Sequence, residues 1–147
     1  MSLSSIKRQI VSCERCPRLR AYCARIARQK RAAYRTAPYW GKPVPGFGDR
    51  LARVMVLGLA PAAHGANRTG RVFTGDRSGD FLIRAMHEAG FTNQPNTDHA
   101  RDGLKLKDAY INTVIRCAPP ENRPLPSEIQ HCSSFLEAEL KLLARVQ

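Results

Sequence analysis

The chain has 147 residues, enough for one domain with a sizeable core, and its 43% hydrophobic content is ordinary for a globular protein. It contains no apolar run long enough to cross a bilayer, and residues 1–10 carry no signal-peptide pattern, which argues against integral membrane and secreted classes. We therefore expect a cytoplasmic protein with no membrane partner.

The net charge of +12 is concentrated in one part of the chain. Residues 1–53 hold 13 Lys and Arg against 2 Asp and Glu, whereas residues 54–147 hold 11 against 10. A concentrated positive field favours a polyanion such as DNA, through counterion release, or an anionic membrane surface. A basic segment can also be only a solvated face, and composition alone leaves these alternatives open.

The first third of the chain is predicted to be mainly helical, followed by a loop. The pattern over residues 4–35 indicates helix with a break at Pro17. The apolar positions expected to face inward are Ile6, Ile10, Leu19, Tyr22 and Ile26. Residues 38–50 are rich in Pro and Gly and predict an ordered loop packed on the core.

The central stretch, residues 54–76, begins with an apolar and partly β-branched run, which is typical of a strand buried on both faces. Gly58 ends the run, so a loop at the carboxyl end of a core strand must follow. In open α/β sheets ligands bind at such strand ends. The loop is rich in glycine and in polar side chains, namely His64, Asn67, Arg68, Arg71, Thr74 and Asp76. The alternative is a surface loop with chance polar residues.

The remaining elements alternate between helix and strand. Ser78 is a candidate cap for a helix that ends at Gly90, with Phe81, Leu82, Met86 and Ala89 on its inner face. Residues 93–106 predict a polar crossover and residues 109–116 a second buried strand. Strands separated by helical segments predict a parallel, doubly wound sheet.

After the second strand comes a stiff proline-rich loop and then a final helix. Residues 127–130 form a capping box that opens this helix. Its predicted apolar stripe consists of Ile129, Cys132, Leu136, Leu140 and Leu143.

Five cysteines in an apparently cytosolic chain indicate metal or redox chemistry rather than structural disulfides. Cys13 and Cys16 form a Cys-x-x-Cys pair, and Cys117 and Cys132 follow with fourteen residues between them. This spacing does not separate a four-cysteine zinc site from an iron–sulfur cluster. Cys132 could instead be a simple core residue, and Cys23 lies outside the pattern as a packed or free thiol.

The loop after the first buried strand resembles the first motif of the type B (family 5) uracil-DNA glycosylases. The matching residues are Gly58-Leu59-Ala60-Pro61-Ala62, His64-Gly65, Asn67-Arg68-Thr69-Gly70-Arg71 and Phe73-Thr74-Gly75-Asp76. The resemblance implies a three-layer α/β/α fold with a mainly parallel central sheet, spanning residues 1–147 as one domain, with the basic helical segment 1–53 packed on it.

The resemblance also implies an activity. A protein of this family hydrolyses the N-glycosidic bond of uracil in DNA, and of other deaminated bases, leaving an abasic site. The implied setting is a cytoplasmic, nucleoid-associated monomer acting on DNA. The cysteine spacing is similar to that of the [4Fe-4S] cluster of type A and type B members, which favours iron and sulfur over zinc.

The same resemblance suggests roles for individual residues. Phe73 stands where the family stacks the everted base, and Asn112 resembles the asparagine that reads the uracil amide edge, since an amide both donates and accepts. Without the resemblance, Asn112 is equally well a strand-end asparagine. Gly58 and Ala60 belong to the segment that binds the substrate.

Water activation must differ from that of other branches, because Leu59 stands where relatives carry an acidic or amide residue. Asp76 is the best remaining carboxylate, and Asn122 is the best partner for orienting water. His64 is a third candidate, better suited to stabilising the departing anion or contacting phosphate. Asp76 could instead serve as the cap of the following helix.

The family continues beyond this point to a further strand, a His-Pro-Ser type motif and a leucine-like wedge, whereas the printed sequence stops at Gln147. The sequence is thus either part of a longer protein or a short form, and we expect impaired base extrusion and low turnover from it. The main alternative function is a non-catalytic iron–sulfur or zinc nucleic-acid-binding module. A nucleotide-phosphate enzyme is weaker, since no Gly-Lys-Ser/Thr signature is present.

Overall fold

The computed structural model describes residues 1–147 and is built around a small three-stranded sheet. The strand order is β1 (Phe47–Gly48), β3 (Ala109–Thr113), β2 (Val54–Gly58). Strands β2 and β3 run parallel, with Val54 opposite Ala109 and Gly58 opposite Thr113, so both carboxyl ends meet at one edge. The short β1 pairs antiparallel with β3, which makes the sheet mixed.

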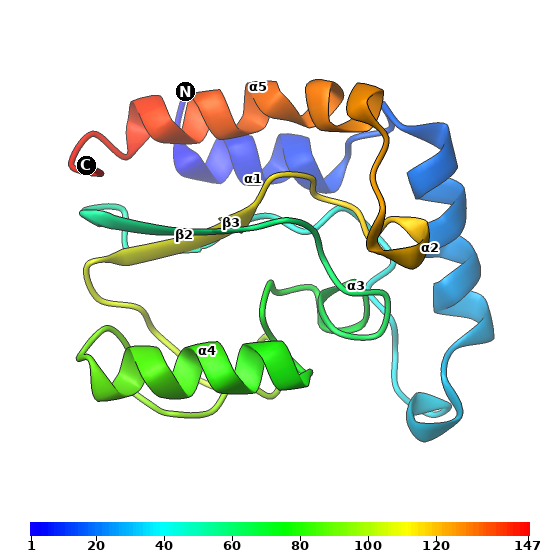
Figure 1. Ribbon diagram of the computed structural model, residues 1–147, viewed down its shortest axis with the longest axis horizontal. Coiled ribbons are helices and arrows are strands. Elements are labelled where there is room, and N and C mark those ends of the chain that lie inside the picture. Colours follow the sequence, from blue (N-terminus) through cyan, green and yellow to red (C-terminus); the bar gives the residue numbers. More distant parts are fainter.

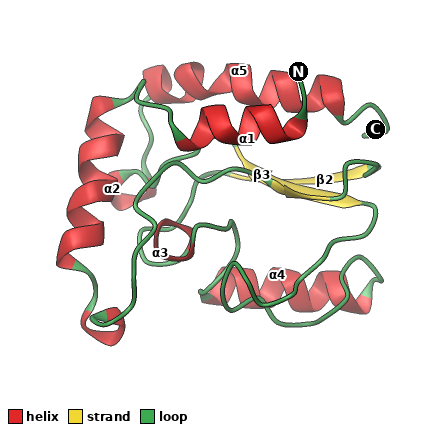
Figure 2. Cartoon of the chain, turned by 180° about the vertical axis from the view of Figure 1, so that it is seen from behind, coloured by secondary structure: helices red, strands yellow, loops and turns green.

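Helices cover both faces of this sheet (Figure 1). Helices α1 (Leu3–Val11) and α5 (Pro126–Leu142) lie on one face, and α4 (Arg77–Glu88) lies on the other. Helix α2 (Pro17–Gln29) stands at the end of the molecule beyond the strand ends, near the short α3 (Ala66–Thr69), as the reverse view in Figure 2 also shows. The expected three-layer α/β/α arrangement is confirmed.

The amino-terminal helices follow their sequence pattern closely. Helix α2 begins at Pro17, which suits the first helical position because the missing N–H would have no partner there. Ile6 and Ile10 of α1 are buried against Phe135 of α5, and this contact joins the two helices of one layer. Tyr22 and Ile26 are only half-buried. A short 3₁₀ turn (Ala32–Tyr34) follows and leads into the loop before β1.

The strand β1 lies within the segment expected to be a loop. Two residues are too few to show a period, and the prolines around them obscure the signal. Glycine is required in β1 because its backbone lies close to that of β3. A Cβ on Gly48, whose φ is +140°, would lie 2.5 Å from the carbonyl oxygen of Ala109.

Helix α4 differs from prediction at its cap and on its inner face. Asp76 rather than Ser78 is the N-cap, and its side chain accepts a hydrogen bond from the Gly79 N–H. On the inner face Met86 is buried as expected and Ile83 is buried beside it, whereas Phe81 is 79% exposed.

The stripe predicted for helix α5 is correct only in part: Cys132 and Leu143 are buried as expected. Ile129 and Leu140 are exposed, whereas Glu128 and Glu139 are buried. Each buried carboxylate has a guanidinium partner: Arg18 for Glu128 and Arg116 for Glu139. A hydrophobic pattern predicts the buried face of such a helix incorrectly, because paired charges can occupy core positions. No helix of the structure has the length and hydropathy needed to span a bilayer.

Candidate active site

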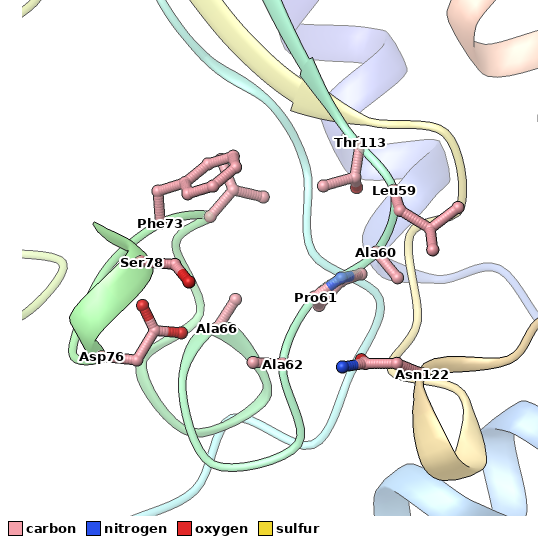
Figure 3. A pocket seen from close by; sticks show the side chains of 11 residues that line it. Leu59, Ala60, Pro61, Ala62, Ala66, Phe73, Asp76, Ser78, Thr113 and Asn122 are labelled. Atoms are coloured by element: carbon pink, nitrogen blue, oxygen red, sulfur yellow. The ribbon is translucent and has the colours of Figure 1, made fainter. Parts of the chain in front are cut away.

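The parallel strands β2 and β3 open at their carboxyl ends into a pocket of about 240 Å³, here called the strand-end pocket (Figure 3). Its walls come from the loop after β2, the start of α4, the end of β3 and the 3₁₀ turn Pro120–Asn122. The lining residues are Leu59, Ala60, Pro61, Ala62, Ala66, Val72, Phe73, Asp76, Ser78, Thr113 and Asn122. The sequence therefore placed the pocket correctly at the edge of the sheet.

Phe73 is the aromatic residue of this pocket, and its position is tightly fixed. Its ring lies against Gly58, where an added Cβ would meet the ring at 2.9 Å. The Phe73 backbone has a φ of +50°, an uncommon conformation for a bulky residue. Thr97 donates a hydrogen bond to its carbonyl oxygen at 3.1 Å, and the absence of a side chain at Gly79 leaves room for that carbonyl. The ring is thus held by its surroundings, which is the arrangement expected of a preorganised contact surface.

Asp76 both caps α4 and lines the pocket. Its Oδ1 accepts the Gly79 N–H at 2.8 Å, whereas Oδ2 has no hydrogen-bond partner in the protein. An added Cβ on Gly65 would lie 2.2 Å from Oδ2, so glycine is required there for the carboxylate to adopt this position. The capping alternative is therefore correct, but it uses only one of the two oxygens.

Asn122 enters the pocket from the side opposite Asp76 (Figure 3). It belongs to the 3₁₀ turn after β3, and both it and Glu121 have positive φ values, 57° and 56°. Leu59 also lines the pocket and is 51% exposed, so the position after Gly58 presents no proton acceptor. The polar groups that face one another across the pocket are the carboxylate of Asp76 and the amide of Asn122.

His64 lies in an adjoining pocket of about 220 Å³, here called the loop pocket. It is lined by Arg31, Tyr34, Ala62, Ala63, His64, Gly65, Gly75 and Asp76. His64 Nδ1 is 2.8 Å from the hydroxyl of Tyr39. Burial, together with the charges of Arg31 and Arg68, lowers the pKa of His64 below its ordinary value. The structure thus separates His64 from the strand-end pocket, with Asp76 and Ala62 shared by both.

The four cysteines of the spaced pattern line one narrow cavity between α2, α5 and the end of β3. Cys16, Cys117 and Cys132 are buried and Cys13 is half-buried. Burial and the neighbouring thiols Cys132, Cys117 and Cys13 raise the pKa of Cys16 to about 11. No three His, Cys, Asp or Glu side chains are arranged to hold a single metal ion. Cys23 is buried in the same cluster as Cys16, Cys117 and Cys132 but does not line the cavity, and its thiol donates to the Ala118 carbonyl oxygen at 3.4 Å.

Comparison with known proteins identifies the family. The family model described as "Uracil DNA glycosylase superfamily" matches residues 45–146, which is more than half of the chain. The chain belongs to the uracil DNA glycosylase superfamily.

Individual relatives within the superfamily give a finer comparison. The chain is 50% identical over 143 residues to a type-5 uracil-DNA glycosylase of Mycobacterium tuberculosis, covering 97% of this chain and 53% of the relative. It is 46% identical over 147 residues to the type-5 uracil-DNA glycosylase of Thermus thermophilus, covering 66% of that relative. A type-4 uracil-DNA glycosylase of Thermotoga maritima is 32% identical over 101 residues, covering 68% of this chain and 45% of the relative. The chain thus spans about half to two thirds of the length of these type-5 relatives.

One residue expected in the site of this superfamily member lies elsewhere. The side chain of Asn112 is fully buried beneath α5, where its Nδ2 donates to Glu139 Oε1 at 3.0 Å. It does not line the strand-end pocket. The next residue, Thr113, does, because successive side chains of a strand point to opposite faces. The expectation that Asn112 reads the base is therefore corrected. Asn112 precedes Thr113 by one residue, so its side chain points to the opposite face of the sheet, toward α5.

Thr113 and Ser78 are the polar pocket residues that sequence reasoning missed. The sequence predicts Ser78 as the helix cap, but Asp76 is the cap and Ser78 is the second residue of α4. Its position there places it in the lining of the pocket. The alternation of β3 offered a signal for Thr113, since Ala109 and Ile111 pack in the core on the α4 side and fix the face on which Thr113 lies.

Proposed function

We propose that this superfamily member is a monofunctional type B DNA repair glycosylase, a hydrolase that releases uracil from DNA in base excision repair and leaves an abasic site. The observation that carries the proposal is the strand-end pocket, where an aromatic ring lies beside a carboxylate and an amide. Enzymes that remove a base must take it out of the stack, hold it in a closed pocket and deliver water to the sugar carbon. The pocket has a candidate group for each of the last two tasks.

The base would be held between Phe73 and the Gly58–Ala62 segment. The ring supplies a stacking surface, and Gly58 lets it approach the strand end closely. Ala60 presents only a methyl group to the pocket, so its backbone is accessible to the edge of a base. Leu59 gives no polar discrimination, which supports a range that extends from uracil to other deaminated bases.

Water would be held between Asp76 and Asn122. The helix cap uses only Oδ1 of Asp76, so Oδ2 has no protein partner and is free to accept a proton. The Asn122 amide, across the pocket, donates and accepts at once and so orients the water without competing for its proton. His64 stands outside this arrangement and would act on the DNA from the loop pocket.

Cys13, Cys16, Cys117 and Cys132 would hold a [4Fe-4S] cluster. Four thiols lining one cavity match the donor set. The similarity of the cysteine spacing to that of type A and type B members supports the cluster over a single zinc ion. The cluster supplies a structural cross-link when bound, joining α2 to α5 and to the loop after β3.

The partner would be DNA containing uracil or other deaminated bases, bound by a monomer at the nucleoid in the cytoplasm. The excess of positive charge in residues 1–53 supports this partner. We treat residues 1–147 as a single domain on which the basic segment packs, as the contact between α1 and α5 suggests.

An alkali-cleavage assay on labelled oligonucleotides tests the proposal. The substrates carry uracil or thymine at one position, in single and double strands, with protein in excess. We expect cleavage at uracil only, and faster in single strands, because no base pair must be opened there. Binding to both oligonucleotides without cleavage of either would instead identify a non-catalytic nucleic-acid-binding module.

A further inference from the structure

The loop pocket adjoins the strand-end pocket directly. The two share Ala62 and Asp76, so a nucleotide whose base enters one would have its sugar and phosphate beside the other. The loop pocket is also bordered by cationic groups, with Arg31 in its lining and Arg68 behind Tyr34. Asp76 is the one carboxylate in its lining, so an anionic group would fit on the side of Arg31 and His64.

The hydrogen bonds of Tyr39 favour one of the two neutral forms of the His64 ring. The hydroxyl oxygen of Tyr39 accepts the Arg31 backbone N–H at 3.3 Å, and the same oxygen is 2.8 Å from His64 Nδ1. The Arg31 amide donates to the phenol oxygen and leaves the phenol hydrogen available for donation to Nδ1. In a neutral imidazole whose Nδ1 accepts, the proton resides on Nε2.

The surroundings keep this arrangement rigid and the ring neutral. Arg68 donates through Nε to the His64 carbonyl at 2.7 Å and through a terminal nitrogen to the Gly75 carbonyl at 2.7 Å. Its guanidinium carbon lies 3.8 Å from the centre of the Tyr34 ring. Lys30 is held to the Ala37 carbonyl at 2.8 Å and lies 5.8 Å from the centre of the Tyr39 ring. Burial and the nearby arginines lower the pKa of His64, which favours the neutral form.

We propose that Tyr39 is a positioning residue that fixes His64 as the Nε2–H tautomer, and that this N–H binds a phosphodiester next to the everted nucleotide in the loop pocket. The inference rests on the proposed function, because it takes the strand-end pocket as the place of the base. A neutral donor in a cationic surround suits a phosphate oxygen, since it adds a directed hydrogen bond to the general attraction of the arginines. His64 Nε2 has no hydrogen-bond partner within the protein.

Long-range ¹H–¹⁵N NMR of the histidine rings tests the tautomer. The wild-type protein should show His64 as a single Nε2–H tautomer, identified by the loss of its signals in His64→Ala. Tyr39→Phe should remove that preference and give a mixture, whereas Tyr34→Phe should retain it, because the Tyr34 hydroxyl makes no hydrogen bond to His64. An Nδ1–H tautomer in the wild type, or an unchanged spectrum in Tyr39→Phe, would overturn the role of Tyr39.

A binding cycle tests the phosphate contact without relying on turnover. The probe is a single-stranded oligonucleotide with a non-hydrolysable 2′-fluoroarabino-uridine, in which each flanking phosphodiester is replaced in turn by an uncharged methylphosphonate. His64→Ala should weaken binding of the unmodified strand about tenfold, as expected for one charge-assisted hydrogen bond. The loss should disappear with one of the two methylphosphonates, and His99→Ala, an exposed histidine on another loop, should show no such dependence.

Equal losses with all backbones would overturn the phosphate contact. A matching strand with thymidine in place of the uridine analogue separates this result from a failure of the proposed function. If the His64 dependence on one phosphate is present with both bases, the phosphate site stands and base recognition by the strand-end pocket fails.

Discussion

Asp76 serves two purposes with its two carboxylate oxygens. Oδ1 accepts the Gly79 N–H and begins α4, and Oδ2, which lies beside Gly65, has no protein partner, while the residue lines both the strand-end pocket and the loop pocket. A cap and a proton acceptor make different demands on the side chain, because an amide can satisfy the first and not the second. The two purposes can therefore be separated by substitution.

We predict that Asp76→Asn retains stability and loses activity. Asparagine caps helices about as well as aspartate, so the free energy of unfolding in urea should change by only a few tenths of a kcal/mol. Single-turnover uracil release should fall by about 100-fold or more, because the amide accepts no proton. Asp76→Ala should lose the same activity and in addition about 1 kcal/mol of stability. Normal release by Asp76→Asn would assign proton transfer to another group.

We predict that Asn112 matters for stability rather than for the base. Its Nδ2 donates to Glu139 in a fully buried site, so Asn112→Ala should reduce the free energy of unfolding by about 1–3 kcal/mol. Affinity for uracil-containing single strands, measured below the unfolding transition, should stay near that of the wild type. A large loss of affinity with unchanged stability would restore Asn112 as a base-reading residue.

The site residues differ in how far the sequence could predict them. Phe73, Asp76 and Asn122 belong to short loop motifs whose order along the chain brings them to the same sheet edge, and the structure shows all three in one pocket. His64 belongs to the same motif but faces the adjoining pocket. The direction of a side chain in a loop cannot be predicted from hydrophobic periodicity, because a loop has no regular repeat. Asn112 and Thr113 are adjacent in β3 and therefore point to opposite faces of the sheet. Which of the two faces the pocket depends on how β3 is placed in the sheet.

At the scale of elements, a buried ion pair joins α5 to the loop that follows β3. Arg116 and Glu139 are both fully buried, and Glu139 also accepts from Asn112. Removing one charge from such a pair leaves the other without compensation in a low-dielectric environment. The interface should therefore be sensitive to the loss of either partner.

We predict that Glu139→Gln lowers the free energy of unfolding by about 3–5 kcal/mol. Glu137→Gln, an exposed change on the same helix, is the matched control and should stay within about 0.5 kcal/mol of the wild type. The combined change Arg116→Met with Glu139→Leu should recover much of the loss, because it removes both charges and fills the space. Urea denaturation checks all three, and a mild effect of Glu139→Gln would show that the Arg116 charge is compensated without Glu139.

Element boundaries were predictable where a strong local signal existed. Pro17 marked the start of α2, and the apolar run from Val54 marked β2. The expectation that this strand is buried on both faces was wrong, because β2 lies at the edge of the sheet and Val54 and Leu57 are exposed. The inner faces of α4 and α5 were not predictable in the same way. In α4 the apolar residues 81–83 follow one another around the helix, and in α5 the carboxylate of Glu139 occupies a core position because Arg116, in the loop after β3, pairs with it.

At the scale of the whole molecule, the four spaced cysteines connect segments that are far apart in the sequence. Cys13 and Cys16 come from the region between α1 and α2, Cys117 follows β3, and Cys132 lies in α5. A cluster held by them would fix the basic amino-terminal region relative to the strand ends. The position of the amino-terminal region relative to the strand ends, and the stability of the fold, should then depend on the cluster.

We predict that the protein purified without oxygen is brown and absorbs broadly in the blue, with iron and sulfide in near-equal amounts. Cys16→Ser should lose this absorption and lower the thermal midpoint, whereas Cys23→Ser, outside the set of four, should retain the colour. Metal analysis and the visible spectrum make the measurement. A colourless protein with one zinc per chain would replace the cluster by a zinc site.

The central claim is that the strand-end pocket holds an everted uracil with Asp76 facing the sugar. A crystal structure of the protein with a single strand containing 2′-fluoroarabino-uridine measures this directly. We predict that the uracil ring stacks on Phe73 and that Asp76 Oδ2 and the Asn122 amide lie within reach of one water beside the sugar C1′ carbon. A uracil bound outside this pocket, or one stacked in it with Asp76 on the far side from C1′, would contradict the account.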